Sequence, residues 1–195
     1  MTVEPSACDP QLTRAGGVHP DGNALAVGNE AANTAGVAMM FAEITTARLR
    51  LVPFDDDTAR AVLGGDLSGV DAVEGWPHDG TMNGLQHAVD LDEPPGWMIT
   101  MNGRVIGDCG THGSADVDGA IEIGYALASQ VRRQGYGTEA VGAMTDWLFG
   151  RPGTRTVRAR TLANNTASRR VLEKNGFSLT GYDPDGQAVY QREVS

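Results

Sequence analysis

The run Arg132-Arg133-Gln134-Gly135-Tyr136-Gly137-Thr138 decides the fold of this 195-residue chain. It lies between a strand-like segment, residues 120–127, and a helix-like segment, residues 135–149. Glycine accepts the dihedral angles of a tight turn and lets the backbone approach a ligand closely. The helix that follows opens with amides that have no intrahelical acceptor, and two arginines supply forked cationic donors. The run therefore predicts a binding site for an anion of the size of pyrophosphate.

Several kinds of site share this glycine pattern. Gly135, Gly137 and Ala140 fit the dinucleotide-binding pattern G-x-G-x-x-A, which also requires an acidic residue at the end of the next strand. That strand ends here in Arg160 and Thr161, so an enzyme that binds NADP through Arg160 stays open. The alternative that the run is only a glycine-rich turn with solvated arginines also remains. A Walker-type phosphate loop is excluded, because no Gly-Lys-Ser/Thr triplet follows the glycines.

Three further motifs flank this run. Glu122-Ile123-Gly124-Tyr125 lies in the preceding strand, Asn165 to Ser168 opens a later helix, and Glu173-Lys174-Asn175-Gly176-Phe177 closes that helix. In order and spacing these motifs resemble the GNAT acyltransferase superfamily, in particular its RimJ/RimL-like branch. The resemblance covers the chain from about Ile44 to the C-terminus. Dinucleotide-dependent dehydrogenases have no reason to contain the last two motifs.

The resemblance implies an α/β fold with a mixed, mostly antiparallel central sheet and flanking helices. The parallel strands that hold Tyr125 and Val157 are expected to splay and admit a ligand between them. The implied activity is that of an N-acetyltransferase, which moves an acyl group from acetyl-CoA to an amine by direct attack on the thioester, without a metal. The implied partners are acyl-CoA and an amine acceptor, with the protein a monomer or homodimer. A non-catalytic module that binds or senses acyl-CoA is the alternative.

The residues that hold the coenzyme are implied by the motifs that match the family. The backbone amides of the opening run are implied to bind the pyrophosphate of CoA, and Asn165 is implied to hold the pantetheine arm or its strand. The implied set is Arg132, Arg133, Gln134, Gly135, Tyr136, Gly137, Thr138, Asn165 and Ser168. Asn165 also suits a simpler role as the N-cap of its helix.

The acceptor amine must lose a proton before it attacks, because a lysine-like amine is protonated at neutral pH. Glu122 is the candidate base, directly or through water, because its strand faces the thioester in this family. Glu122 also suits a role that only orients the ammonium ion, or an ion pair with Arg132 or Arg133. His112, at the end of the preceding hairpin strand, is the second candidate base.

The leaving thiolate requires a proton donor. Many family members have a Tyr seven residues after the motif Asn, where this chain has Leu172. The RimJ/RimL-like branch instead has a Ser three residues after that Asn, which is Ser168 here. Ser168, near the positive end of the last helix, is therefore the candidate donor, and Tyr125 is the alternative. Serine is also common at helix starts for structural reasons. Cys109 is expected to be a buried strand residue.

The composition is that of an ordinary globular domain, with 41% hydrophobic residues and only two cysteines, which form no C-x-x-C pair. The four histidines show no metal-binding spacing. No apolar run approaches the length of a membrane span and no secretory signal is visible, so we expect a cytoplasmic protein without membrane contact. Residues 1–38 have few large apolar side chains and are predicted to be a disordered extension, which leaves residues 39–195 as the domain.

Charge is unevenly distributed along the chain, whose net charge is −10. Residues 39–120 hold 14 acidic and 4 basic side chains, whereas residues 121–195 hold 7 acidic and 10 basic ones. A chain this acidic is a poor nucleic-acid binder. In this family the acceptor binds to the part of the fold that is acidic here, so the acidic charge favours a cationic acceptor. The alternative is that these acidic side chains only form a solvated surface. The acceptor stays open between a small cationic amine, such as an aminoglycoside-like antibiotic, and a protein N-terminal amine.

Hydrophobic periodicity and turn signals predict the remaining elements. We expect an alternating strand over residues 44–51, a helix from Asp55 to about Leu63, and a second helix over residues 81–91. A hairpin through Asn102-Gly103 is expected to follow. The central helix is expected to bury one face, formed by Ala140, Val141, Met144 and Leu148.

Overall fold

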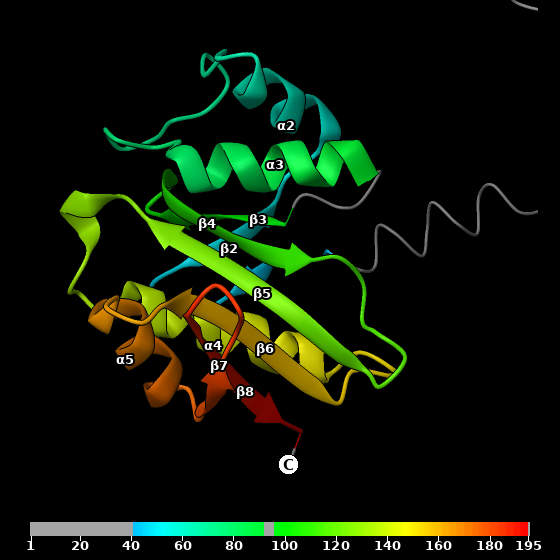
Figure 1. The fold of residues 1–195 in the computed structure, drawn as a ribbon. Coiled ribbons are helices and arrows are strands. Elements are labelled where there is room, and N and C mark those ends of the chain that lie inside the picture. Colours follow the sequence, from blue (N-terminus) through cyan, green and yellow to red (C-terminus); the bar gives the residue numbers. More distant parts are fainter. Residues whose placement is uncertain (1–40, 92–95, 195) are drawn as a thin grey trace, which may run out of the picture.

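The computed structural model of the protein describes residues 41–91 and 96–194 (Figure 1). The predicted disordered extension, residues 1–38, lies outside the described residues. The strands are β1 (Ile44–Thr45), β2 (Arg50–Pro53), β3 (Trp97–Met101), β4 (Arg104–His112), β5 (Ala120–Leu127), β6 (Thr156–Leu162), β7 (Ser178–Tyr182) and β8 (Gln187–Glu193). The helices are α2 (Asp56–Leu63), α3 (Asp79–Leu91), α4 (Tyr136–Phe149) and α5 (Thr166–Lys174), with a 3-10 turn, η1 (Ser129–Val131). Within the described ranges, no helix is long and apolar enough to cross a membrane.

The described strands form one eight-stranded sheet in the order β1-β2-β3-β4-β5-β6-β8-β7. Neighbouring strands are antiparallel except for β5 and β6, which run parallel. Helices α2 and α3 lie together on one face of the sheet, and α4 and α5 lie on the other (Figure 1). The mixed, mostly antiparallel α/β fold predicted from the sequence is therefore confirmed.

The parallel pair separates partway along its length. Strands β5 and β6 pair only as far as Ile123 and Ala159. Beyond these residues β5 continues beside β4, and β6 continues beside β8. Backbone groups that face this opening have no strand partner there, so water, a ligand or other groups must satisfy them. The predicted splay of the two parallel strands is confirmed.

Alternate residues of the sheet face two separate apolar cores. Ile106 packs in the larger core, with α4, whereas its neighbour Val105 packs in the smaller core, with α2 and α3. The larger core receives the predicted face of α4, because all four of its residues are at most 3% exposed: Ala140, Val141, Met144 and Leu148. The predicted buried face of the central helix is therefore confirmed.

The strand predicted over residues 44–51 is instead a hairpin of β1 and β2. Thr46 turns the chain there, because its N donates to Leu49 O and its Oγ1 accepts from Leu49 N, both at 2.9 Å. Helix α3 begins at Asp79, two residues before the predicted start, because His78 Nδ1 accepts a hydrogen bond from Thr81 N at 3.2 Å and so caps the helix.

The hairpin between β3 and β4 agrees with the sequence-based expectation. Asn102 and Gly103 both have positive φ, 52° and 82°, as the favoured two-residue hairpin turn requires. Strand β4 ends at His112, as expected from the sequence, and its second half forms one wall of the site described below.

We expect Met144→Ala to lower the free energy of unfolding by about 2–5 kcal/mol, because it leaves a cavity in the larger core. Met144 is fully buried between α4 and the sheet. Chemical denaturation followed by circular dichroism measures the change. Val117→Ala is the matched control, since the fully exposed Val117 should contribute no more than about 0.5 kcal/mol. Equal stability of the two variants would contradict the assignment of this core.

Candidate active site

The glycine run forms an open turn at the start of α4. Gly135 has a φ of 85° and stands at the N-cap position, where no side chain caps the helix. Asp55 and Asn165, by contrast, cap α2 and α5 through their side chains. Arg133 also lies in the left-handed region, with a φ of 66°. Because the first-turn amides of a helix have no intrahelical acceptor, this turn presents donors and a positive dipole end to an anion.

Arg48 holds this turn in place from a distant part of the sequence. Its Nη1 donates to Gln134 O at 2.9 Å, and its Nε donates to Glu139 Oε2 at 2.7 Å. Its guanidinium carbon also lies 4.6 Å from the centre of the Tyr136 ring. Burial raises the pKa of Glu139, but hydrogen bonds from Thr46 and Arg48 outweigh that effect and hold this pKa below its ordinary value. Sequence reasoning missed Arg48, because only folding brings it to the turn.

The two arginines of the run, Arg132 and Arg133, are exposed. Arg132 Nε donates to Leu127 O at 2.9 Å, so this side chain joins the end of β5 to the turn. The predicted coenzyme-binding residues of the run thus form the turn before α4 and the first residues of that helix, and η1 joins them to the unpaired half of β5.

Tyr125 of β5 and Ser168 of α5 meet through their hydroxyl groups. The Tyr125 hydroxyl lies 2.8 Å from Ser168 Oγ, where either oxygen can donate, and it also donates to Ser168 O at 3.2 Å. Asn165 Oδ1 accepts from Ser168 N at 3.1 Å and caps α5. Burial raises the pKa of Tyr125 to about 12, against a lowering by the Ser168 hydrogen bond, so the phenol is protonated at neutral pH. The two predicted proton donors therefore form one hydrogen-bonded pair.

Glu122, the predicted base, is bound by an arginine of the neighbouring strand. Arg160 Nε donates to Glu122 Oε1 at 2.9 Å, and Arg160 Nη1 lies 3.7 Å from Asp183 Oδ2. The ion pair suggested from the sequence, with Arg132 or Arg133, is therefore corrected to one with Arg160. The reason is register: Arg160 stands two residues beyond the β6 partner of Glu122 and so shares its face of the sheet.

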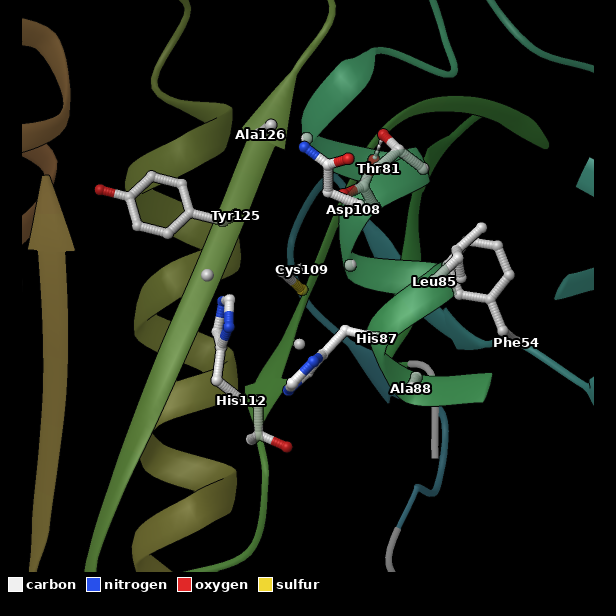
Figure 2. Close-up of a pocket in the computed structure, with 16 residues that line it drawn as sticks. Phe54, Thr81, Leu85, His87, Ala88, Asp108, Cys109, His112, Tyr125 and Ala126 are labelled. Atoms are coloured by element: carbon white, nitrogen blue, oxygen red, sulfur yellow. Dashed lines mark hydrogen bonds between the residues drawn. The ribbon is translucent and has the colours of Figure 1, made fainter. Parts of the chain in front are cut away.

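A pocket of about 500 Å³ opens on the face of the sheet that α3 covers (Figure 2). Gly110 of β4 and Gly124 of β5 are cross-strand partners, so they form a floor without side chains. His112, the second candidate base, lies over this floor, since a Cβ on Gly124 would come within 2.6 Å of its Nε2. Its ring centre is 6.4 Å from that of His87 on α3, and the two rings approach each other in Figure 2. A cavity of this size suits a small molecule.

The same pocket contains a carboxyl group that sequence reasoning missed. Asp108 Oδ2 accepts hydrogen bonds from Thr81 Oγ1 at 2.5 Å and from Trp76 Nε1 at 2.8 Å, and His78 Nε2 lies 4.0 Å away. Burial raises the pKa of Asp108, although the two hydrogen bonds and the charge of His78 act in the opposite direction. These residues come from a loop, α3 and β4. The signal in the sequence was an acidic residue between the apolar residues 105–107 and Cys109.

Cys109 is buried in the strand, as predicted from the sequence. Its burial, and then the charge of the neighbouring Asp108, raise the pKa of the thiol well above its ordinary value. Because the thiolate is the nucleophilic form of cysteine, this thiol is unreactive at neutral pH.

Comparisons with known proteins agree with this geometry. The family described as Acetyltransferase (GNAT) domain matches residues 48–178. A protein of Bacillus subtilis (strain 168) named "Uncharacterized N-acetyltransferase YjdG" is 36% identical over 85 residues, which are 43% of this chain and 51% of that protein. The matched segment thus spans about half the length of this relative.

Solved structures share the fold. An acetyltransferase from Agrobacterium tumefaciens str. C58 is similar with a TM-score of 0.57 and 25% identity, over 79% of this chain and 95% of that one. The RimL ribosomal L7/L12 alpha-N-protein acetyltransferase in complex with coenzyme A has a TM-score of 0.59 and 19% identity, over 78% and 98% of the two chains. At that identity the likeness to RimL shows the fold alone.

We expect Tyr125 to make the protein less stable at alkaline pH. The contribution of Tyr125 to the free energy of unfolding is complete below its ordinary pKa of 10.0. It is lost as the pH rises to about 12, because between these values the phenol is ionised in the unfolded chain and protonated in the folded one. The loss is roughly 1.4 kcal/mol per pH unit. Denaturant unfolding at several alkaline pH values, for the wild type and Tyr125→Phe, measures this difference. Parallel pH dependences of the two proteins would contradict the raised pKa.

Proposed function

This chain belongs to the GNAT acetyltransferase family, and we propose that it transfers an acetyl group from acetyl-CoA to the amino group of an acceptor. One observation supports the proposal above all: the half of β5 that has lost its parallel neighbour leads, through the short η1 turn, to the uncapped helix start at Gly135. A long ligand with a diphosphate at one end and a thioester at the other suits this combination. RimL, which shares the fold, was solved with coenzyme A.

The coenzyme is proposed to lie along the opening between β5 and β6. The amides of residues 132–138 would hold its diphosphate, because the helix start is free of a side-chain cap there. Asn165 and Ser168, at the start of α5, are proposed to contact the pantetheine arm. When bound, acetyl-CoA supplies an acyl group activated as a thioester.

The leaving thiolate is proposed to receive its proton from the hydroxyl pair of Ser168 and Tyr125. The two oxygens lie 2.8 Å apart, so a proton given by one can be replaced from the other. Both hydroxyls lie close to the start of α5, whose dipole favours developing negative charge. Leu172 stands where many family members have their donor, and it is fully buried in this protein.

Glu122 is proposed to attract the acceptor. The ammonium proton, which must leave before the nitrogen attacks, is proposed to pass to His112, the second candidate base, which lines the pocket. Arg160 donates to one carboxylate oxygen of Glu122, so this carboxylate is already paired with a cation of the protein. The same ion pair argues against the NADP alternative, because Arg160 is already bound by Glu122 and lies near Asp183. Its guanidinium is therefore engaged on the protein rather than open to a 2′-phosphate.

A small cationic amine is proposed as the acceptor. The pocket beside α3 is of small-molecule size, and the part of the chain that builds most of it is strongly acidic. A protein N-terminal amine is the second candidate, because RimL of the same fold is an alpha-N-protein acetyltransferase.

The proposal is tested by the release of free CoA thiol from acetyl-CoA in the presence of amines. The panel contains phenethylamine, spermidine, an aminoglycoside and short peptides with free N-termini. We expect thiol release that depends on at least one of these amines. Coenzyme binding without any turnover would instead support the acyl-CoA-sensing alternative, and stabilisation by NADPH but not CoA in thermal-shift titration would support the dinucleotide alternative.

Two variants separate the proposed roles at the reacting end of the site. We expect Ser168→Ala to lower kcat at least about tenfold, because a proton donor contributes roughly 100-fold or more and Tyr125 replaces it in part. We expect Glu122→Gln to raise KM for cationic amines less than about tenfold and to leave kcat nearly unchanged. Steady-state kinetics and CoA titration measure both. A collapse of kcat in Glu122→Gln would make Glu122 the base after all.

We also expect Arg48→Ala to weaken CoA binding about fivefold, because it removes one hydrogen bond worth about 1 kcal/mol. Arg48 holds the carbonyl of Gln134, so its removal lets the diphosphate-binding turn move. Arg50→Ala is the matched control, because Arg50 pairs with Glu43 in a similar way but does not contact the turn. Isothermal titration calorimetry measures both affinities. Equal affinities for the two variants would show that Arg48 does not position the turn.

A further inference from the structure

The pocket beside α3 is a groove along two paired strands. Asp108, Gly110 and His112 alternate along β4 and line the same face, opposite Ala126, Gly124 and Glu122 of β5. The paired glycines contribute no side chains to the middle of this groove. The backbones of Asp108 and His112 are about 13 Å apart along the strand, and the imidazole of His112 lies over Gly124.

Asp108 stands beside the half of β5 that has separated from β6. Its strand partner is Ala126, whereas the last residue of β5 that pairs with β6 is Ile123. Glu122 lies at the other end of the groove, beside the half that is still paired. Asp108 is therefore the carboxyl group of this groove that lies nearer to the opening proposed to admit the thioester.

The hydrogen bonds to Asp108 leave one of its oxygens available. Trp76 Nε1 and Thr81 Oγ1 both donate to Oδ2, and no residue in the described ranges donates to Oδ1. The basic side chain of the described residues that lies within ion-pair distance is His78, whose Nε2 is 4.0 Å from Oδ2. Neither Arg nor Lys pairs with this carboxyl group in the described part of the chain. A largely buried carboxyl group that lacks such a partner costs free energy, which a bound cation would recover.

The other side chains that line the pocket indicate which kind of molecule carries this cation. Phe54, Leu85 and Ala88 line the pocket with apolar side chains that are otherwise buried. Glu122, on the same face of the sheet but outside the pocket lining, is already bound by Arg160. The pocket thus offers one acidic oxygen that has no donor among the described residues, an apolar wall, and the rings of His87 and His112.

We propose that Asp108 recognises the acceptor: Oδ1 binds the ammonium group of a monocationic amine whose apolar body lies against Phe54, Leu85 and Ala88. This inference rests on the proposed function and specifies its substrate class. Asp108 touches the acceptor and not the coenzyme. Polyamines and aminoglycosides are poorer acceptors, because their further cations find no free carboxylate in this pocket.

The first test compares acceptors on the wild-type enzyme. We expect kcat/KM to be higher for phenethylamine than for spermidine, an aminoglycoside or a short peptide. We also expect phenethylamine to bind more tightly than 2-phenylethanol, its uncharged analogue, by about 10- to 100-fold, which is the effect of one charge-assisted hydrogen bond. A preference for spermidine or peptides would overturn the proposed substrate class while leaving the proposed acetyl transfer in place.

The second test removes the charge of Asp108. In Asp108→Asn the side-chain oxygen can still accept from Trp76 and Thr81, while an amide NH₂ group replaces Oδ1. We expect KM for phenethylamine to rise about 10- to 100-fold, with unchanged affinity for CoA and for 2-phenylethanol. An unchanged KM would overturn the proposal. An equal loss of affinity for both phenethyl compounds would show that Asp108 only supports the pocket wall.

Thr81→Val is the matched control, because it removes one donor to Oδ2 and keeps the carboxyl group. We expect its preference for phenethylamine over 2-phenylethanol to stay within about threefold of the wild-type value.

Should Asp108→Asn not fold, the comparison of the two phenethyl compounds on the wild type still decides whether charge is recognised. Should no amine release thiol from acetyl-CoA, the proposed function fails by itself, and calorimetric titration with phenethylamine still tests whether Asp108 binds an ammonium group.

Discussion

The separation of β5 from β6 is the constraint on which the rest of the structure depends. A parallel pair in the middle of a sheet stops pairing at Ile123 and Ala159, although both strands continue. Buried backbone N–H and C=O groups require partners, so such an opening persists only where something else satisfies them. Every part of the candidate site adjoins it: the glycine turn follows β5, α5 approaches through Ser168, and the pocket lies beside β5.

Because successive side chains of β5 point to opposite faces of the sheet, neighbouring residues of this strand contribute to the two sides of the candidate site. The hydroxyl of Tyr125 reaches Ser168 at the start of α5, whereas Gly124 forms the floor of the pocket under α3. The absence of a side chain at Gly124 leaves space for His112. In the proposed reaction, the coenzyme and the acceptor therefore approach the same short stretch of strand from different directions. Their charges also differ, because the diphosphate meets a basic part of the chain and the acceptor an acidic one.

The features that could be predicted are those that depend on neighbours in sequence. The glycine turn, the hairpin at Asn102-Gly103 and the buried face of α4 follow from dihedral preferences and helical periodicity. The errors have a different origin. The alternating pattern over residues 44–51 predicts one strand, although the chain turns at Thr46. Glu122 was expected to pair with Arg132 or Arg133, whereas the register of β5 and β6 brings Arg160 to it. Proposed roles for Glu122, Ser168 and the turn residues stay predictions.

The sequence by itself determined the family, the mixed sheet and the glycine turn, because each of these rests on short motifs with local conformational causes. Only the tertiary structure decided which side chains meet. Arg48 reaches Gln134 across 86 positions, and Thr81 reaches Asp108 across 27. The burial that raises the pKa of Asp108 is likewise a property of the packed pocket. No local pattern encodes such contacts, since hydrogen-bond partners and desolvation depend on where distant segments pack.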